Sequence, residues 1–116
     1  MKKVYHLSTC STCKRILKEA NLESKGFELQ DIKSKALTEA QVDQMAVLTG
    51  SYEALFSRKS RKYAEYGLKD KNLTEEDYRS LILKEYTFLK RPVVIDGQQI
   101  FVGNSKQTIE EIITST

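Results

Sequence analysis

The spacing of hydrophobic and polar positions changes along the chain, and each change marks a different kind of element. Residues 3–7 form a short β-prone run that ends at Ser8 and Thr9. Apolar residues then recur at the spacing of a helix, at Cys13, Ile16, Leu17 and Ala20. Residues 27–32 follow Gly26 and largely alternate apolar with polar side chains, as a half-buried strand does. The first third of the chain is therefore predicted to be a β-α-β unit.

A helical pattern replaces this alternation from about residue 34 to residue 88. Thr38 and Gln41 have the spacing of a capping box, and Gly50 is placed to end the helix that follows. A further helix is predicted after Thr74, because the next three residues are acidic and the helix dipole favours negative charge there. Its inner face is predicted to contain Tyr78, Leu81 and Ile82.

The last third of the chain reads as a hairpin followed by a helix. Pro92 precedes the apolar run 93–95, and Asp96-Gly97-Gln98-Gln99 separates that run from residues 100–102. Asn104 is predicted to cap a final helix in which one face is shared by Ile109, Ile112 and Ile113. The order β-α-β, helical insert, β-β-α predicts an α/β fold of the thioredoxin-like type, with a mixed sheet covered by helices.

Length and composition limit the possible classes of protein. A chain of 116 residues suits one domain, predicted here to cover residues 1–116. With 30% charged residues and a net charge of +3, we expect neither a membrane span nor direct binding of nucleic acid. The start of the chain lacks the uninterrupted apolar run of a signal peptide, and the only two cysteines lie three positions apart. These features favour a reducing compartment, and we expect the cytoplasm.

Cys10 and Cys13 are the strongest candidates for chemistry. Cys10 follows the first predicted strand and Cys13 falls in the first turn of the predicted helix, so the helix start favours a thiolate at Cys10. The alternative is that Cys13 is a small core residue and that only Cys10 reacts. A structural zinc site needs about four ligands, whereas this chain offers one C-x-x-C and one histidine. No metal site is expected.

Three further side chains are candidates for the same site. His6 lies four residues before Cys10, where it either influences the thiol loop or serves only to pack the end of a strand. Arg58 belongs to a basic cluster that either is solvated or binds an anion. Arg91 adjoins Pro92, and its planar donor fork suits a tetrahedral oxyanion better than a lysine would.

Three blocks of sequence, residues 5–14, 56–58 and 89–94, together resemble the arsenate reductase (ArsC)/Spx family. The resemblance extends over essentially the whole chain. It implies the thioredoxin-like fold with a helical insert. It also implies a cis peptide bond at Pro92, facing the loop that contains Cys10.

The same resemblance implies an activity and its residues. Cys10 matches the nucleophile that attacks arsenate in reductases of this type, and His6 matches the histidine four positions before that cysteine. Arg91 and Arg58 match residues that bind the oxyanion. The expected partners are a small oxyanion and a thiol reductant, either glutathione with glutaredoxin or thioredoxin. No bound cofactor is expected.

Other residues keep a second interpretation open. The reductases usually carry an arginine after the hairpin, and residues 101–104 of this chain contain none. The reductases also usually lack a cysteine at the position of Cys13. Spx, a redox-controlled regulator that binds the RNA polymerase α C-terminal domain, has a C-x-x-C switch, but it has neither His6 nor Lys14. We expect a reductase-like enzyme, with Cys13 as resolving thiol. An Spx-like regulator is the alternative, and a protein with the fold but only a structural role is a third.

Overall fold

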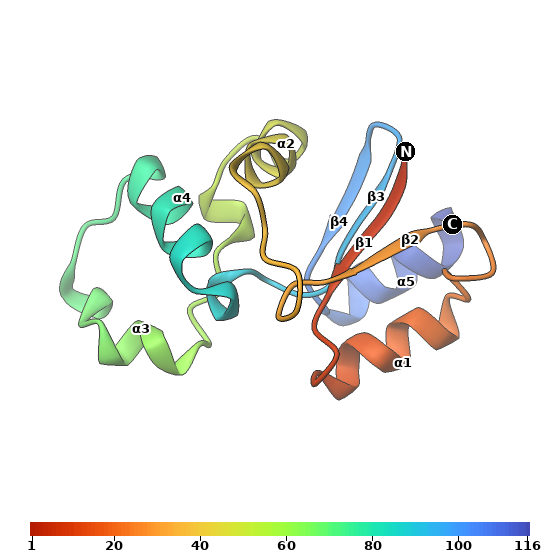
Figure 1. Cartoon of the computed structure of the whole chain (residues 1–116), viewed down its shortest axis with the longest axis horizontal. Helices are drawn as coiled ribbons and strands as arrows, with labels where there is room; N and C mark the ends of the chain where they lie inside the picture. Colours follow the sequence, from red (N-terminus) through yellow and green to blue (C-terminus); the bar gives the residue numbers. More distant parts are fainter. The chain divides into compact units, whose positions relative to one another are not determined.

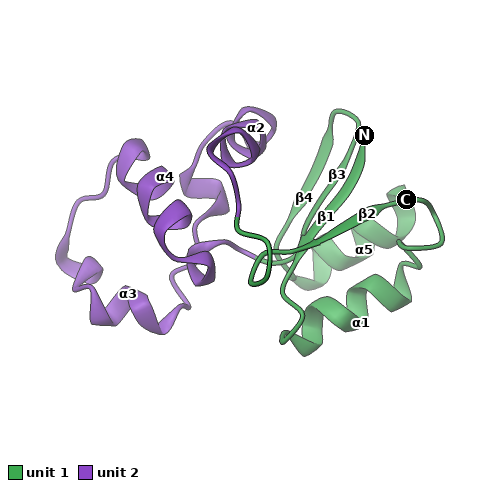
Figure 2. Cartoon of the chain, in the orientation of Figure 1, with its two compact units in different colours: residues 1–36, 91–116 green, residues 37–90 purple.

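The computed structural model describes residues 1–116, which divide into two compact units (Figures 1 and 2). Unit 1 contains residues Met1–Ala36 and Arg91–Thr116, and unit 2 contains residues Leu37–Lys90. None of the helices combines the length and the apolar composition that crossing a membrane requires.

Unit 1 contains a sheet of four strands, which are β1 (Lys2–His6), β2 (Glu28–Asp31), β3 (Val93–Asp96) and β4 (Gln99–Val102). Their order in the sheet is β2-β1-β3-β4. β1 pairs with β2 in parallel and with β3 antiparallel, and β3 pairs with β4 antiparallel. The sheet is therefore mixed, as predicted, and the predicted α/β fold is confirmed.

Two helices, α1 (Ser11–Glu19) and α5 (Lys106–Ser115), pack against one face of this sheet (Figure 1). The face is marked by Val4 of β1 and Val94 of β3, which are cross-strand partners and are completely buried. Ile16 of α1 and Ile112 of α5 belong to the same cluster of buried side chains. Burial of these aliphatic side chains is the main favourable contribution to the stability of unit 1.

The strand register brings several chain segments to one edge of the sheet. Val93, the first residue of β3, pairs with Tyr5 near the end of β1. Val93 also pairs with Val102, the last residue of β4. Helices α1 and α5 begin shortly after β1 and β4 end. Consequently the end of β1, the cis Arg91–Pro92 bond and the starts of both helices share this edge.

The β3–β4 hairpin is tighter than the sequence suggested. Asp96 pairs with Gln99, so that only Gly97 and Gln98 lie between the strands. Gly97 has a φ of 63°, a left-handed conformation that two-residue hairpin turns require and that glycine adopts without strain.

Unit 2 is helical and contains α2 (Glu39–Thr49), α3 (Arg61–Glu65) and α4 (Glu75–Lys84), with three short 3₁₀ turns at Glu53–Leu55, Leu68–Asp70 and Tyr86–Phe88. Capping boxes start α2 at Thr38 and α4 at Thr74. The ring of Phe56 packs against Tyr78 at a centroid distance of 4.9 Å and against Phe88 at 5.0 Å. An aromatic cluster is therefore central to the packing of this unit.

Two expectations about α5 are wrong. Ser105, not Asn104, caps the helix, because its hydroxyl accepts a hydrogen bond from the Thr108 N–H. Asn104 instead donates from Nδ2 to the carbonyl oxygen of Arg91 at 3.0 Å. Ile113 does not share the buried face, since it is 40% exposed whereas Ile112 is completely buried. The turn of about 100° between successive helix residues separates these two neighbours.

This pair of isoleucines provides a matched test of the core. Ile112→Ala should lower the free energy of unfolding by about 2–5 kcal/mol, because it removes buried methyl groups and leaves a cavity. Ile113→Ala should change the free energy of unfolding by less than about 1 kcal/mol, because an exposed side chain loses little buried contact and leaves no cavity. Urea unfolding of both variants measures the difference, and equal losses would contradict the described packing of α5.

Candidate active site

Cys10 lies at the edge of unit 1 where β1 ends and α1 begins. Its backbone N–H donates to the carbonyl oxygen of Leu7 at 2.9 Å, which closes a tight turn after β1. Cys10 is the N-cap residue of α1, and its carbonyl oxygen accepts from the Lys14 N–H at 3.2 Å. The sulfur is therefore held beside the first N–H groups of a helix, which have no partner within the helix itself.

This environment lowers the pKa of the Cys10 thiol. Partial burial acts to raise the pKa. Four groups lower it, which are the N–H and the thiol of Cys13, the positive charge of Arg91 and the N–H of Thr12. Their effect is the larger one, and the net pKa lies below the ordinary value. The Cys10 side chain makes no capping hydrogen bond of ordinary geometry. These groups therefore act through their stabilisation of negative charge on the sulfur.

Cys13 has the opposite properties. It is completely buried in the first turn of α1, and burial is the main reason why its pKa rises to about 12. Negative charge on Cys10 raises it further, because two neighbouring sulfur anions repel each other. Both cysteines are free thiols in the structure. The pair therefore combines a sulfur at Cys10 whose ionisation is favoured with a shielded sulfur at Cys13 that stays protonated near neutral pH.

Arg91 and Pro92 are held at the same edge by backbone contacts. The Arg91–Pro92 peptide bond is cis, as the resemblance implied. The Gly103 N–H donates to the Pro92 carbonyl oxygen at 2.9 Å, and Asn104 binds the carbonyl of Arg91. The guanidinium of Arg91 lies close enough to lower the pKa of Cys10, so the structure brings these two predicted site residues together.

His6 occupies the last position of β1 and pairs with Asp31 at the end of β2. Its Nδ1 is buried and has no hydrogen-bond partner in the structure. The electrostatic attraction between the two side chains helps to lower the pKa of Asp31, after the larger contribution of a hydrogen bond from the Ser8 side chain. His6 thus ends the strand that leads into the turn containing Cys10, and it lies beside Asp31 in the strand register.

Sequence reasoning missed Asp31. Its Oδ1 accepts hydrogen bonds from the Ser8 N–H at 3.2 Å and from the Lys33 N–H at 3.1 Å. A signal was present, because Asp31 is the last polar residue of the strand predicted over residues 27–32, and the carboxyl ends of neighbouring parallel strands meet at one edge of a sheet. What the sequence does not contain is the register that places His6 beside Asp31.

Arg58 belongs to unit 2, where other side chains bind it. Its Nη2 contacts Glu53 Oε2 at 2.9 Å and the Tyr78 hydroxyl at 3.0 Å. The guanidinium carbon also lies 5.9 Å from the centre of the Phe56 ring. Within its unit Arg58 is thus an ordered cation with an acidic partner, whereas His6, Cys10, Cys13 and Arg91 belong to unit 1.

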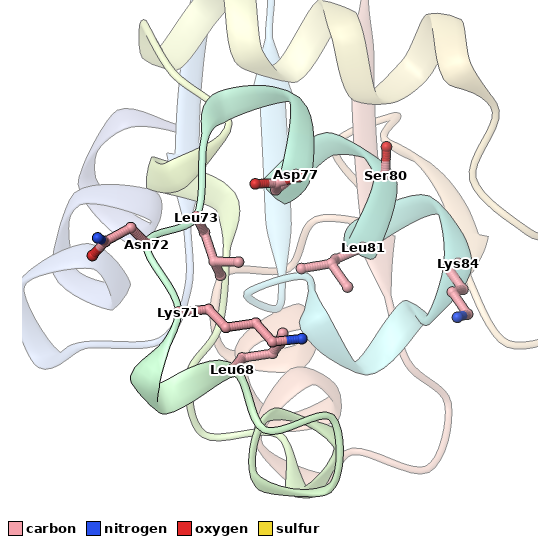
Figure 3. A pocket seen from close by; sticks show the side chains of 8 residues that line it. All are labelled: Leu68, Lys71, Asn72, Leu73, Asp77, Ser80, Leu81 and Lys84. Carbon is pink, nitrogen blue, oxygen red and sulfur yellow. The ribbon is translucent and has the colours of Figure 1, made fainter.

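A surface groove of about 620 Å³ lies in unit 2, beside α4 (Figure 3). Its walls contain three leucines, two lysines and polar side chains, which are Leu68, Leu73, Leu81, Lys71, Lys84, Asn72, Asp77 and Ser80. It contains no thiol, no histidine and none of the predicted site residues. The structure also contains no group of three or more histidine, cysteine, aspartate or glutamate side chains that could hold a metal ion.

The contrast between the two thiols leads to a prediction about Cys13. Cys13→Ala removes a donor to the Cys10 sulfur and should raise the pKa of Cys10 by about one unit, whereas Cys13→Ser keeps a donor and should raise it less. The rate of alkylation by iodoacetamide, measured against pH with the modified residue identified by mass spectrometry, gives the pKa. In the unsubstituted chain the midpoint of the rate profile at Cys10, which marks the pKa, should lie below about pH 8.5, since a lowered pKa moves ionisation to lower pH. An identical pKa in all three proteins would show that Cys13 does not act on Cys10.

Comparison with known proteins agrees with this architecture. The arsenate reductase of Vibrio cholerae covers 96% of this chain and 96% of its own length, at a TM-score of 0.74 and 23% identity. An arsenate reductase (ArsC) related protein of Brucella melitensis covers 99% of this chain and 95% of its own length, at a TM-score of 0.72 and 19% identity. Both likenesses concern the fold.

Sequence comparison identifies the family. The uncharacterised protein YusI of Bacillus subtilis (strain 168) is 27% identical over 112 residues, which cover 92% of this chain and 93% of YusI. The sequence profile of the ArsC family matches residues 5–112, a segment that includes both cysteines, Arg58 and the cis proline. The chain therefore belongs to the ArsC family.

Proposed function

We propose that this chain is a thiol-dependent oxidoreductase that reduces a small tetrahedral oxyanion through Cys10, with arsenate as the first candidate. The observation that carries the proposal is the Cys10 sulfur, whose pKa is lowered beside the guanidinium of Arg91 and the buried thiol of Cys13. A nucleophilic sulfur needs to be ionised near neutral pH, and an anionic substrate needs a fixed cation beside that sulfur. Membership of the ArsC family supports the same reaction class.

The proposed reaction begins with attack on the oxyanion. The Cys10 thiolate displaces one oxygen of arsenate, which leaves as water after protonation, and a bond forms between sulfur and arsenic(V). A second thiol then attacks the Cys10 sulfur. The sulfur–arsenic bond breaks and its electron pair remains on arsenic, which is reduced to arsenite as the two sulfurs become a disulfide. Arg91 stabilises the negative charge of the bound oxyanion in this scheme.

The second thiol is either Cys13 or an external thiol such as glutathione. Cys13 is the nearer candidate, but its pKa of about 12 keeps it protonated while Cys10 is an anion. Once Cys10 is bonded to arsenic its charge is lost, and one cause of the high pKa of Cys13 is lost with it. A thiol reductant, glutaredoxin or thioredoxin, then restores the dithiol by exchange.

The pair of free thiols also supports a second candidate function, a redox-sensing regulator that binds the RNA polymerase α C-terminal domain. A Cys10–Cys13 disulfide would be the switch in such a protein. Capture of that purified domain to different extents by the reduced and the oxidised chain, without turnover of arsenate, would favour the regulator over the enzyme.

Turnover of arsenate with glutathione and glutaredoxin tests the proposal. Cys10→Ser should abolish the activity. Arg91→Ala should lower kcat/KM by about 10²–10³-fold, because a preorganised donor to the oxyanion is lost. Arg91→Lys should keep the low pKa of Cys10 yet still reduce turnover, since it preserves the charge but not the paired donors.

Exposed Arg61 provides the matched control, and Arg61→Lys should leave turnover unchanged. Arg58→Ala, assayed beside it, measures whether the second candidate arginine contributes. Absence of Cys10-dependent turnover with arsenate, together with an ordinary thiol pKa at Cys10, would contradict the proposal.

A further inference from the structure

A single carboxylate connects β2 to the turn that contains Cys10. Asp31 is the last residue of β2 and lies directly beside His6 of β1, because the two strands are paired in parallel. The Ile32 N–H donates to the His6 carbonyl oxygen at 2.9 Å and continues the ladder one residue further. The backbone of Asp31 is therefore fixed by the sheet, and its side chain is free to reach the segment that leaves β1.

The Asp31 carboxylate binds that segment at Ser8. Oδ1 accepts the Ser8 backbone N–H at 3.2 Å. Two residues later the Cys10 N–H donates to Leu7 at 2.9 Å. These two hydrogen bonds restrain the turn on both sides of Thr9, and the second one sets the entry of the chain into α1.

Restraint of this turn affects the sulfur because stabilisation of the Cys10 thiolate depends on geometry. The N–H groups of Thr12 and Cys13 and the guanidinium of Arg91 stabilise the anion only when Cys10 occupies the N-cap position. N–H dipoles lose their effect over short distances, within the first turn of a helix. A turn that samples several conformations would therefore have a less stable thiolate.

By its charge alone, Asp31 would act in the opposite direction. A carboxylate close to Cys10 repels a sulfur anion and so disfavours the thiolate. The hydrogen bond from the Ser8 side chain, with those from the backbone of Lys33 and Ser8, lowers the pKa of Asp31, so the group stays ionised near neutral pH. Any benefit of Asp31 to Cys10 consequently comes from position and not from charge.

We propose that Asp31 is a positioning residue for Cys10, which holds the Ser8–Cys10 turn so that the thiol stays at the start of α1. The role of Asp31 in reaction with oxyanions rests on the proposed function above. Its role in holding the thiol does not, because that role is visible in the reactivity of Cys10 without any substrate. His6, paired beside Asp31 and attracted to it, is part of the same arrangement.

The test compares two substitutions that separate position from charge. Asp31→Asn keeps an acceptor oxygen and removes the charge, whereas Asp31→Ala removes both. If Asp31 positions the thiol, Asp31→Ala should raise the pKa of Cys10 and Asp31→Asn should stay much closer to the unsubstituted protein. Each unit of increase lowers the alkylation rate about tenfold at pH values below both pKa values.

Asp96 provides the matched control, since it ends β3 and pairs with Lys2 at the opposite end of β1 from Cys10. Asp96→Ala should leave the pKa of Cys10 unchanged. Circular dichroism and thermal unfolding of every variant show whether it is folded. If Asp31→Ala does not fold, Asp31→Asn still decides the test. A pure charge effect predicts that the Cys10 pKa of the Asp31→Asn variant falls below that of the unsubstituted chain, whereas a positioning role predicts a pKa close to it.

Three results would overturn the inference. The first is a lower pKa of Cys10 in both Asp31 variants, which would show that the charge dominates. The second is an unchanged pKa in a folded Asp31→Ala protein, even if that protein is less stable, which would make Asp31 a structural residue only. The third is a rise in pKa as large in Asp96→Ala as in Asp31→Ala. A failure of the proposed function looks different, because it shows as an absence of Cys10-dependent turnover, which does not enter the comparison of Cys10 pKa values among the Asp31 variants.

Discussion

Negative charge on the Cys10 sulfur is the state on which the rest of this site depends. In an uncharged surface loop nothing stabilises the thiolate relative to the thiol. At the start of a helix the thiolate faces N–H groups that lack partners, and these stabilise it. In this chain those groups belong to Thr12 and Cys13, and Arg91 adds a fixed positive charge. The fold therefore places the beginning of α1 and the cis bond before β3 at one edge of the sheet, which brings these groups to the Cys10 sulfur.

The pKa values of the two cysteines differ mainly because Cys13 is more deeply buried than Cys10. Cys13 lies on the buried face of α1 in the same helical turn that favours an anion at Cys10, yet burial raises its pKa to about 12. The sequence alone left open whether Cys13 is a core residue or a second reactive thiol. The structure shows that Cys13 is a buried core residue that also stabilises negative charge on the Cys10 sulfur, and its own reactivity stays a prediction.

Local patterns predicted the elements well, because each depends on residues close together in the chain. The capping box at Thr38 and Gln41 is an example, since its two hydrogen bonds join residues three positions apart. Contacts that depend on register were not predictable in this way. The pairing of His6 with Asp31 joins positions 25 residues apart, and no local signal contains it. Its consequence, the hydrogen bond from Ser8 to Asp31, was missed for the same reason.

The arginines illustrate the same limit. Arg91 was predicted beside Cys10 from its position before a proline, and the structure places its charge there. Arg58 was predicted from a resemblance, but no pattern indicated that Glu53 and Tyr78 would bind its guanidinium within unit 2. A short basic cluster gives the charge of a segment and not the partners of each side chain.

The most direct measurement is a titration of the Cys10 thiolate in folded and unfolded protein. The Cys13→Ser variant leaves one thiol, whose ionisation can be followed by its ultraviolet absorbance in buffer and in concentrated urea. The account predicts a pKa in the folded protein that lies clearly below that of the unfolded chain, which should be close to the ordinary value of about 8.5. Equal values in the two states, or a higher value in the folded protein, would show that the arrangement around Cys10 does not stabilise the anion and would contradict the account.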